Sequence, residues 1–143
     1  MSNADKAVAI FKEGFSCSQA VLAAYCERFG LDLDTAMKIS TGFGGGMHLK
    51  QTCGAVTGAI MAIGLKYGRT KADDQASKAK TYEIVAEFAN EFKRRHGSIA
   101  CLELIGCDIT TPEGMQQARD EKLFASVCTK LITTATEILD RIL

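Results

Sequence analysis

The hydrophobic positions along the chain recur with the three-to-four-residue period of amphipathic helices, almost from end to end. The clearest stripe lies near the C-terminus and consists of Phe124, Val127, Cys128, Leu131, Ile132, Ala135, Ile138, Leu139 and Ile142. Alternating runs typical of strands are absent, and the only proline is Pro112. The pattern therefore predicts an all-α protein: a single domain over residues 1–143, built as a helical bundle of about five to seven helices.

Glycines and capping residues divide this pattern into separate helices. The expected helices cover about residues 3–13, 17–29, 32 or 34 to 40, 53–67, 71–95, a short one between 98 and 106, and a last one from 115 or 119 to the C-terminus. In the helix over 71–95, the expected inner face carries Tyr82, Val85, Ala89 and Phe92. The segments 41–47 and 107–117 are expected to be loops.

Three of the six cysteines are expected at the starts of helices. They are Cys17 after a Ser16–Gln19 capping box, Cys53 after a Thr52 cap, and Cys101 in the first turn after a Ser98 cap. A helix N-terminus offers free N–H groups and a partial positive charge, and both favour thiolate over thiol. Because the thiolate attacks disulfides and binds soft metals, this placement indicates redox or metal chemistry.

The charge balance excludes some other function classes. Lys and Arg together number 17, as do Asp and Glu, so a nucleic-acid partner is not expected. The first residues do not resemble a signal peptide, and no apolar stretch is long enough for membrane insertion. We therefore expect a cytoplasmic protein, in which six cysteines indicate free thiols, a catalytic disulfide or a metal site.

The spacing of the cysteines requires any shared site to be assembled from distant helices, because the chain has no Cys-x-x-Cys pair. Cys26 follows Cys17 by nine residues, which places the two on opposite helix faces, so Cys26 is expected to be a core thiol. Cys128 lies on the apolar stripe, where an isolated thiol is usually a core residue. Cys107 is expected in a loop and could join a site.

Cys53 is the strongest single candidate for chemistry. A glycine-rich loop with Gly45 and Gly46 precedes it, and Gly54 and Gly58 follow on the same helix. Glycine inside a helix costs about 1 kcal/mol relative to alanine, so these glycines indicate that another backbone or a cofactor comes close. All four glycines are therefore candidates for cofactor binding, with tight helix packing as the alternative. The loop lacks the Lys-Ser/Thr ending of a phosphate loop, and its His48 is expected to be solvated.

Three segments, FSCSQAVLAAY, CGAVTGAIMAIGLKYG and FKRRHGSIACLELIGCDI, carry a family resemblance together with the late cysteine before the C-terminal helix. This chain resembles the C_GCAxxG_C_C family of redox-active proteins from about Gly14 to Leu143, with the motif CGAxxG at residues 53–58. The resemblance implies family cysteines at Cys17, Cys53, Cys101 and Cys128, with Cys107 as a rival for the third; Cys26 matches none. A similar domain accompanies haem in split-Soret cytochromes, which favours electron transfer or an iron–sulfur centre, although no Cys-x-x-Cys-His site is present.

Three functions are compatible with this sequence. In the first, Cys17, Cys53, Cys101 and Cys128 hold an iron–sulfur cluster or another metal for electron transfer with an unknown redox partner. In the second, Cys53 is the catalytic nucleophile of a thiol–disulfide couple, and Cys17 or Cys101 resolves it. In the third, the chain is a non-catalytic helical interaction domain. Exposed small-residue helix faces would also allow a homodimer.

Overall fold

The helices begin and end largely where capping residues and glycines predict. The computed structural model describes residues 1–143 and contains α1 (Asn3–Lys12), α2 (Cys17–Tyr25), α3 (Leu33–Ser40), α4 (Gly54–Tyr67), α5 (Gln75–His96), α6 (Cys101–Ile105), α7 (Pro112–Asp120) and α8 (Thr129–Ile142). Two 3₁₀ turns, η1 (Glu27–Phe29) and η2 (Thr41–Phe43), and two π-type turns, η3 (Gly46–Lys50) and η4 (Phe124–Cys128), complete the elements. The prediction of an all-α fold is confirmed.

The local signals act as the sequence indicates. Ser16 and Gln19 form the predicted capping box at the start of α2, and Asp32, not Asp34, caps α3. Gly97 and Gly106 end α5 and α6 in the left-handed conformation that glycine adopts without a steric penalty. These caps provide partners for backbone groups that a helix end would otherwise leave unpaired.

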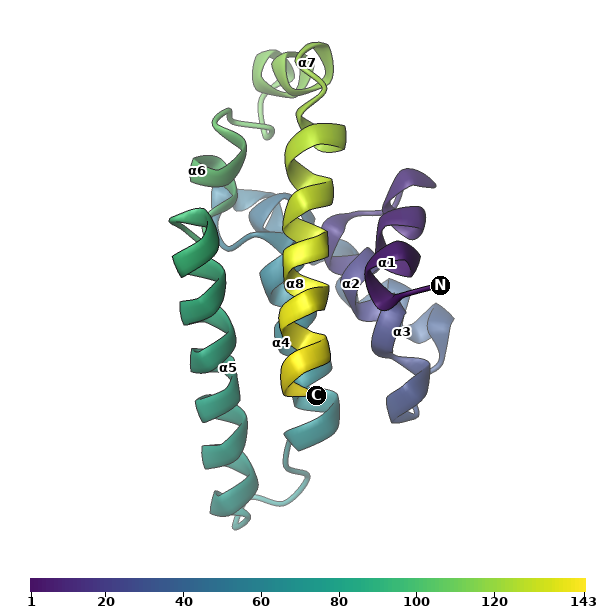
Figure 1. The fold of residues 1–143 in the computed structure, drawn as a ribbon, viewed down its shortest axis with the longest axis vertical. Coiled ribbons are helices and arrows are strands. Elements are labelled where there is room, and N and C mark those ends of the chain that lie inside the picture. The colour runs from purple at the N-terminus through teal and green to yellow at the C-terminus, as the bar shows by residue number, and fades with distance from the viewer.

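The core lies where α2, α4 and α8 meet. Figure 1 shows α8 in front of α4, with α5 along one side and α1 to α3 on the other, while α6 and α7 lie at the upper end. The largest fully buried side chains include Tyr25 from α2, Ile63 from α4, Phe88 and Phe92 from α5, and Ile132 and Leu139 from α8. The part of the predicted apolar stripe that lies in α8, from Leu131 to Leu139, is thus confirmed as the inner face of this helix. Phe124, Val127 and Cys128 instead belong to η4, which precedes it.

Helices α2 and α4 pack closely against each other, and glycine makes this approach possible. A Cβ atom added at Gly58 would lie 2.7 Å from the carbonyl oxygen of Ser18, closer than real Cβ contacts come. Ala55, Ala59 and Ala62 on α4 are completely buried. The close approach predicted from these small residues is therefore confirmed, but this face of α4 is covered within the chain and is not exposed for pairing with a second copy.

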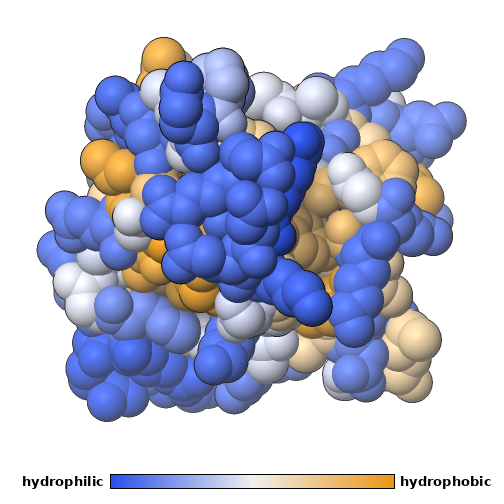
Figure 2. Space-filling model, turned by 90° about the horizontal axis from the view of Figure 1, so that it is seen from above, coloured by the Kyte–Doolittle hydropathy of each residue, from blue (hydrophilic) through white to orange (hydrophobic).

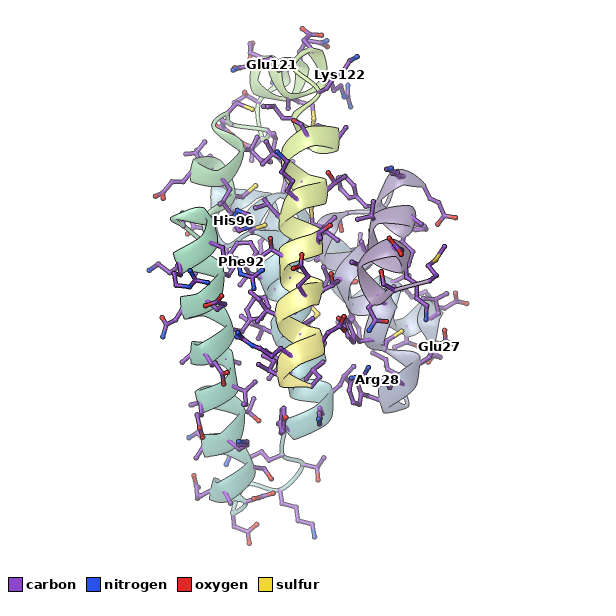
Figure 3. All side chains as sticks on the ribbon, in the orientation of Figure 1. Glu27, Arg28, Phe92, His96, Glu121 and Lys122 are labelled. Carbon is purple, nitrogen blue, oxygen red and sulfur yellow. The ribbon has the colours of Figure 1, made fainter.

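The segment predicted as a loop over 107–117 is partly wrong, because α7 begins at Pro112. Thr111 caps this helix by accepting a hydrogen bond from the Gly114 N–H, and Pro112 occupies the first helical position, where proline is favoured. The helix ends at Asp120, and Lys122 adopts a left-handed conformation (φ 55°) that separates α7 from the C-terminal helix. Figure 3 shows Glu121 and Lys122 at this break, at the upper end of the molecule.

The inner face of α5 differs from the prediction. Ile84, Phe88 and Phe92 are buried, whereas Tyr82 is 65% exposed, and the helix begins at Gln75 after an Asp74 cap instead of near residue 71. His96 ends α5 and faces α8, where its Nε2 is 2.8 Å from Thr134 Oγ1, and its ring is tilted by 46° against the ring of Phe92 (Figure 3). No helix has the length and apolar character needed to cross a membrane.

Candidate functional site

One cavity of about 580 Å³ brings together cysteines from four distant parts of the chain. Its lining includes Cys17, Cys53, Cys101 and Cys128. Cys17 opens α2, Cys53 immediately precedes α4, Cys101 opens α6, and Cys128 ends η4 just before α8. All six thiols of the chain are free, and these four include Cys17, the only cysteine that is not classed as buried. The structure therefore assembles all four of the cysteines to which the sequence assigned chemistry.

The crossing of α2 and α4 places Cys17 beside the start of α4. A Cβ atom at Gly54 would lie 3.2 Å from the Cβ of Cys17 and 2.9 Å from the amide nitrogen of Ser18. Only a residue without a side chain lets the first turn of α2 come this close to the residue after Cys53. The CGAxxG motif is thus a packing device that determines the distance between two of the cysteines.

A short β-bridge fixes the next pair. Thr52 and Ala100 form an isolated antiparallel bridge, in which the Cys53 N–H donates to Ile99 O and the Cys101 N–H donates to Gln51 O, both at 2.7 Å. The predicted caps Thr52 and Ser98 are therefore wrong. Thr52 is engaged in the bridge, so the cap position of α4 falls on the next residue, Cys53. Its bridge partner Ala100 itself occupies the cap position of α6.

Cys128 reaches the cavity from the end of a π-type turn. Such turns interrupt the regular α-helical hydrogen-bonding pattern and occur often at functional sites. Here the turn joins the break at Lys122 to α8, and the Cys128 thiol lies close enough to the Cys17 thiol for each to shift the pKa of the other. Cys17 and Cys128 are therefore neighbours within the cavity.

Burial, not helix polarity, dominates the acidity of two of these thiols. Desolvation raises the pKa of Cys53 to about 12 and that of Cys101 to about 11, above the ordinary value of 9.0. The N–H groups of Ala55 and Val56 partly lower the pKa of Cys53, although neither makes a hydrogen bond of full capping geometry with its sulfur. The expectation that these helix starts yield thiolates is therefore not met at Cys53 and Cys101, because burial outweighs the effect of the N–H groups.

The Cys17–Cys128 contact separates the acidities of its two members. The hydrogen bond with Cys128 is the main reason why the pKa of Cys17 lies well above its ordinary value, and burial and the neighbouring thiols add to the effect. The same hydrogen bond, donated by the Cys17 thiol, lowers the pKa of Cys128. Of the four thiols, Cys128 is therefore the one that most readily becomes a thiolate.

A left-handed turn forms one wall of the cavity. Gly45, Gly46, Met47 and His48 all have φ between 54° and 65°, a conformation that costs a residue with a side chain about 1–2 kcal/mol. A Cβ atom at Gly46 would lie 2.5 Å from the Gln51 nitrogen and 3.0 Å from the Cys101 Cβ. Strained backbone of this kind persists where surrounding structure holds it and is common near functional sites.

The remaining candidates fall into two groups. Gly45, Gly54 and His48 line the cavity, whereas Gly46 and Gly58 pack against backbone beside it. Cys107 is buried next to Cys101 and Cys128 but does not line the cavity, and Cys26 is a fully buried core thiol, as predicted. The sequence reasoning missed the outer walls, above all Ile109, Met115 and Arg119, because they carry no motif and belong to a region predicted largely as loop.

The arrangement of donors distinguishes between kinds of metal site. No group of three or more His, Cys, Asp or Glu side chains is arranged to hold a metal ion. A single tetrahedral zinc ion needs its sulfur ligands at about 2.3 Å from one point, which these side chains do not provide. The donor set itself, four cysteines around one cavity, is the one that iron–sulfur clusters use.

Comparison with protein families matches residues 15–142 to the family described as "Putative redox-active protein (C_GCAxxG_C_C)". The chain belongs to this family. The match extends from the residue before the Ser16 cap to the end of α8, so it includes all four cysteines of the cavity. No curated protein and no solved structure matches the chain significantly.

Proposed function

We propose that this protein transfers electrons through an iron–sulfur cluster held by Cys17, Cys53, Cys101 and Cys128. The observation that carries the proposal is that these four side chains, from four separated elements, line one cavity. Four thiolates are the usual ligands of [2Fe–2S] and [4Fe–4S] clusters. A packing role alone gives no reason for four thiols to meet at the same cavity.

The electrostatics of the site support a cationic occupant. Burial is the main cause of the raised pKa of Cys53, and charge on Cys101 and Cys128 raises it further, so ionised neighbours oppose formation of the Cys53 thiolate in the absence of a cation. Iron would offset this repulsion, and the N–H groups of Ala55 and Val56 would ease the remaining negative charge near Cys53. When bound, a cluster supplies reversible one-electron chemistry, and the chain's own contribution is to hold and shield it.

The geometry supports a cluster over a single ion. Cluster ligands bind different iron atoms, so their sulfurs do not have to surround one point, whereas the ligands of mononuclear zinc do. These side chains do not surround a single point, which is compatible with an iron–sulfur cluster and disfavours a mononuclear zinc ion.

Anaerobic purification tests the proposal directly. We expect visible absorbance, and iron and acid-labile sulfide in comparable amounts, with an electron paramagnetic resonance signal in one oxidation state. Reconstitution of the metal-free protein with ferrous iron and sulfide provides a second route. Protein that stays colourless and iron-free after both treatments would exclude the cluster.

A second candidate function is supported by the Cys17–Cys128 contact. Oxidation of these two thiols to a disulfide would release two electrons and two protons, which a substrate disulfide can accept as it is reduced to two thiols. The lowered pKa of Cys128 favours this residue as the attacking thiolate and Cys17 as the resolving thiol, in place of the Cys53 nucleophile expected from the sequence. Titration in glutathione buffers, with peptide mapping by mass spectrometry, tests this role. A Cys17–Cys128 disulfide in equilibrium with the buffer supports it, and failure of that bond to form contradicts it.

A further inference from the structure

The cavity extends well past the four cysteines and is walled by apolar side chains. Its outer lining consists of Phe11, Phe15, Leu104, Ile109, Met115 and Phe124. These residues come from the end of α1, from α6 and α7, and from the segments next to them, and none of them is fully buried. Figure 2, viewed from the α7 end, shows hydrophobic surface recessed beside a ridge of hydrophilic residues.

The size of this space exceeds what a role in packing requires. Pockets that bind small organic molecules have volumes of about 300–1,000 Å³ and mostly apolar walls with a few polar groups. The cavity has a volume of about 580 Å³ and fits this description. Its apolar lining would remain exposed to water if nothing occupied it, which is unfavourable by about 25 cal/mol for each Å².

Arg119 on α7 is the one side chain of fixed charge that lines the cavity, since no lysine, aspartate or glutamate does. Arg119 is an exposed residue, and it takes part in none of the chain's four salt bridges or side-chain hydrogen bonds, whereas Arg94 and Arg95 both pair with Glu91. A guanidinium without a partner beside an apolar surface is suited to a carboxylate, which it can bind through two parallel hydrogen bonds.

We propose that this cavity binds a small amphipathic organic acid, with its apolar body against the walls and its carboxylate at Arg119. Such a ligand would lie directly over the cysteines. The inference therefore rests on the proposed function and deepens it, because it names the class of molecule that reaches the redox centre. Binding itself depends only on the walls and on Arg119, not on an occupied metal site.

The test uses 8-anilinonaphthalene-1-sulfonate as a fluorescent probe and decanoate, decanol and decylamine as competitors below their micelle-forming concentrations. We expect decanoate to displace the probe at least about tenfold more effectively than decanol, and decylamine to be the weakest, since a charge-assisted hydrogen bond is about twice as strong as a neutral one. Arg119→Gln should weaken decanoate about tenfold and leave decanol unchanged. Arg141→Gln, which removes an exposed arginine on α8 outside the cavity lining, should change neither.

Equal affinity for decanoate and decanol, no displacement of the probe, or an unchanged decanoate affinity in Arg119→Gln would each overturn the inference. Iron and sulfide are measured on the same samples, with and without reconstitution. Acid binding that depends on Arg119 in a protein unable to hold iron would refute the cluster alone. Iron-loaded protein that does not bind decanoate would refute the organic-acid site alone.

Discussion

Thr52 and Ala100 form an antiparallel β-bridge between two segments of an otherwise helical protein. The bridge aligns the residues that follow each of them, so the backbone N–H groups of Cys53 and Cys101 are both used in cross-segment hydrogen bonds. Two cysteines that are far apart in sequence thereby enter the same cavity from fixed backbone positions. The α2–α4 crossing fixes Cys17 relative to this pair, and η4, which leads into α8, supplies Cys128.

Serine substitutions should separate the four cavity cysteines from the other two. We expect Cys17→Ser, Cys53→Ser, Cys101→Ser and Cys128→Ser each to lose most bound iron and visible absorbance, because each removes one cluster ligand. Cys26→Ser and Cys107→Ser should retain both, since neither residue lines the cavity. Iron analysis of anaerobically purified variants, with circular dichroism to verify folding, is the measurement. If all six variants kept their iron, or if the four changed only stability, the cysteines would be packing residues.

The α2–α4 crossing predicts opposite effects of the same substitution at two glycines of α4. Gly58→Ala should destabilise the protein by about 1–3 kcal/mol, because the new Cβ would collide with the backbone oxygen of Ser18 at 2.7 Å. Gly64→Ala should stabilise it by about 0.5–1 kcal/mol, since its Cβ would meet nothing within 4 Å and alanine favours the helix. Urea unfolding of both variants gives the two free energies. Equal effects would show that the close approach of the helices is not needed.

Two glycines in the left-handed conformation, Gly46 in the cavity wall and Gly106 at the end of α6, predict losses of stability of different size when each is replaced by alanine. Gly106→Ala should cost about 1–2 kcal/mol, because Gly106 has a φ of 84° but open space around its Cβ position. Gly46→Ala should cost about 1–3 kcal/mol more, since the Cβ would also overlap Gln51 backbone and contact Cys101. Urea unfolding measures both losses, and iron content should fall only in Gly46→Ala. A smaller loss for Gly46→Ala than for Gly106→Ala would contradict the tight packing of this turn.

The buried thiols predict a loss of stability at alkaline pH in the reduced, metal-free protein. Burial holds the pKa of Cys53 at about 12, whereas the same thiol in the unfolded chain has its ordinary pKa of 9.0. Above pH 9 the unfolded state releases this proton and the folded state keeps it, so stability contributed by this group is present below pH 9 and is lost as the pH rises toward 12. The slope is about 1.4 kcal/mol for each pH unit and ionised thiol.

Cys53→Ser should therefore flatten the decline in stability between pH 9 and pH 11 relative to the parent protein. Between pH 6 and pH 8 the two proteins should show parallel dependences, because Cys53 is protonated in both states there. Urea unfolding of both proteins across this range, in the presence of a reductant, gives the free energy of unfolding of each at every pH. The slope above pH 9 is then compared with the slope between pH 6 and pH 8 in the same protein. Parallel curves above pH 9 would mean that the Cys53 thiol ionises as easily in the folded protein as in the unfolded chain.

The elements that could be predicted from the sequence are those whose signals are local. The Ser16–Gln19 capping box, the Asp32 cap and the glycine ends of α5 and α6 each act within one turn of chain, and the structure has them where the residues indicate. The start of α7 at Thr111–Pro112 was not predicted, although its signal is also local. Gly114 in its first turn is unusual for a helix. Glycine is required there because a Cβ would overlap the carbonyl oxygen of Asp108.

The sequence by itself determined most of the helices and the apolar face of the C-terminal helix, and its family motif singled out the four cysteines that line the cavity, because periodicity, capping and residue type are properties of nearby positions. The tertiary structure decided which thiols touch, how far burial raises the pKa of Cys53, and that Arg119 lies beside the same cavity. These properties depend on water being excluded and on groups from distant segments meeting in space, and no short stretch of the chain encodes either.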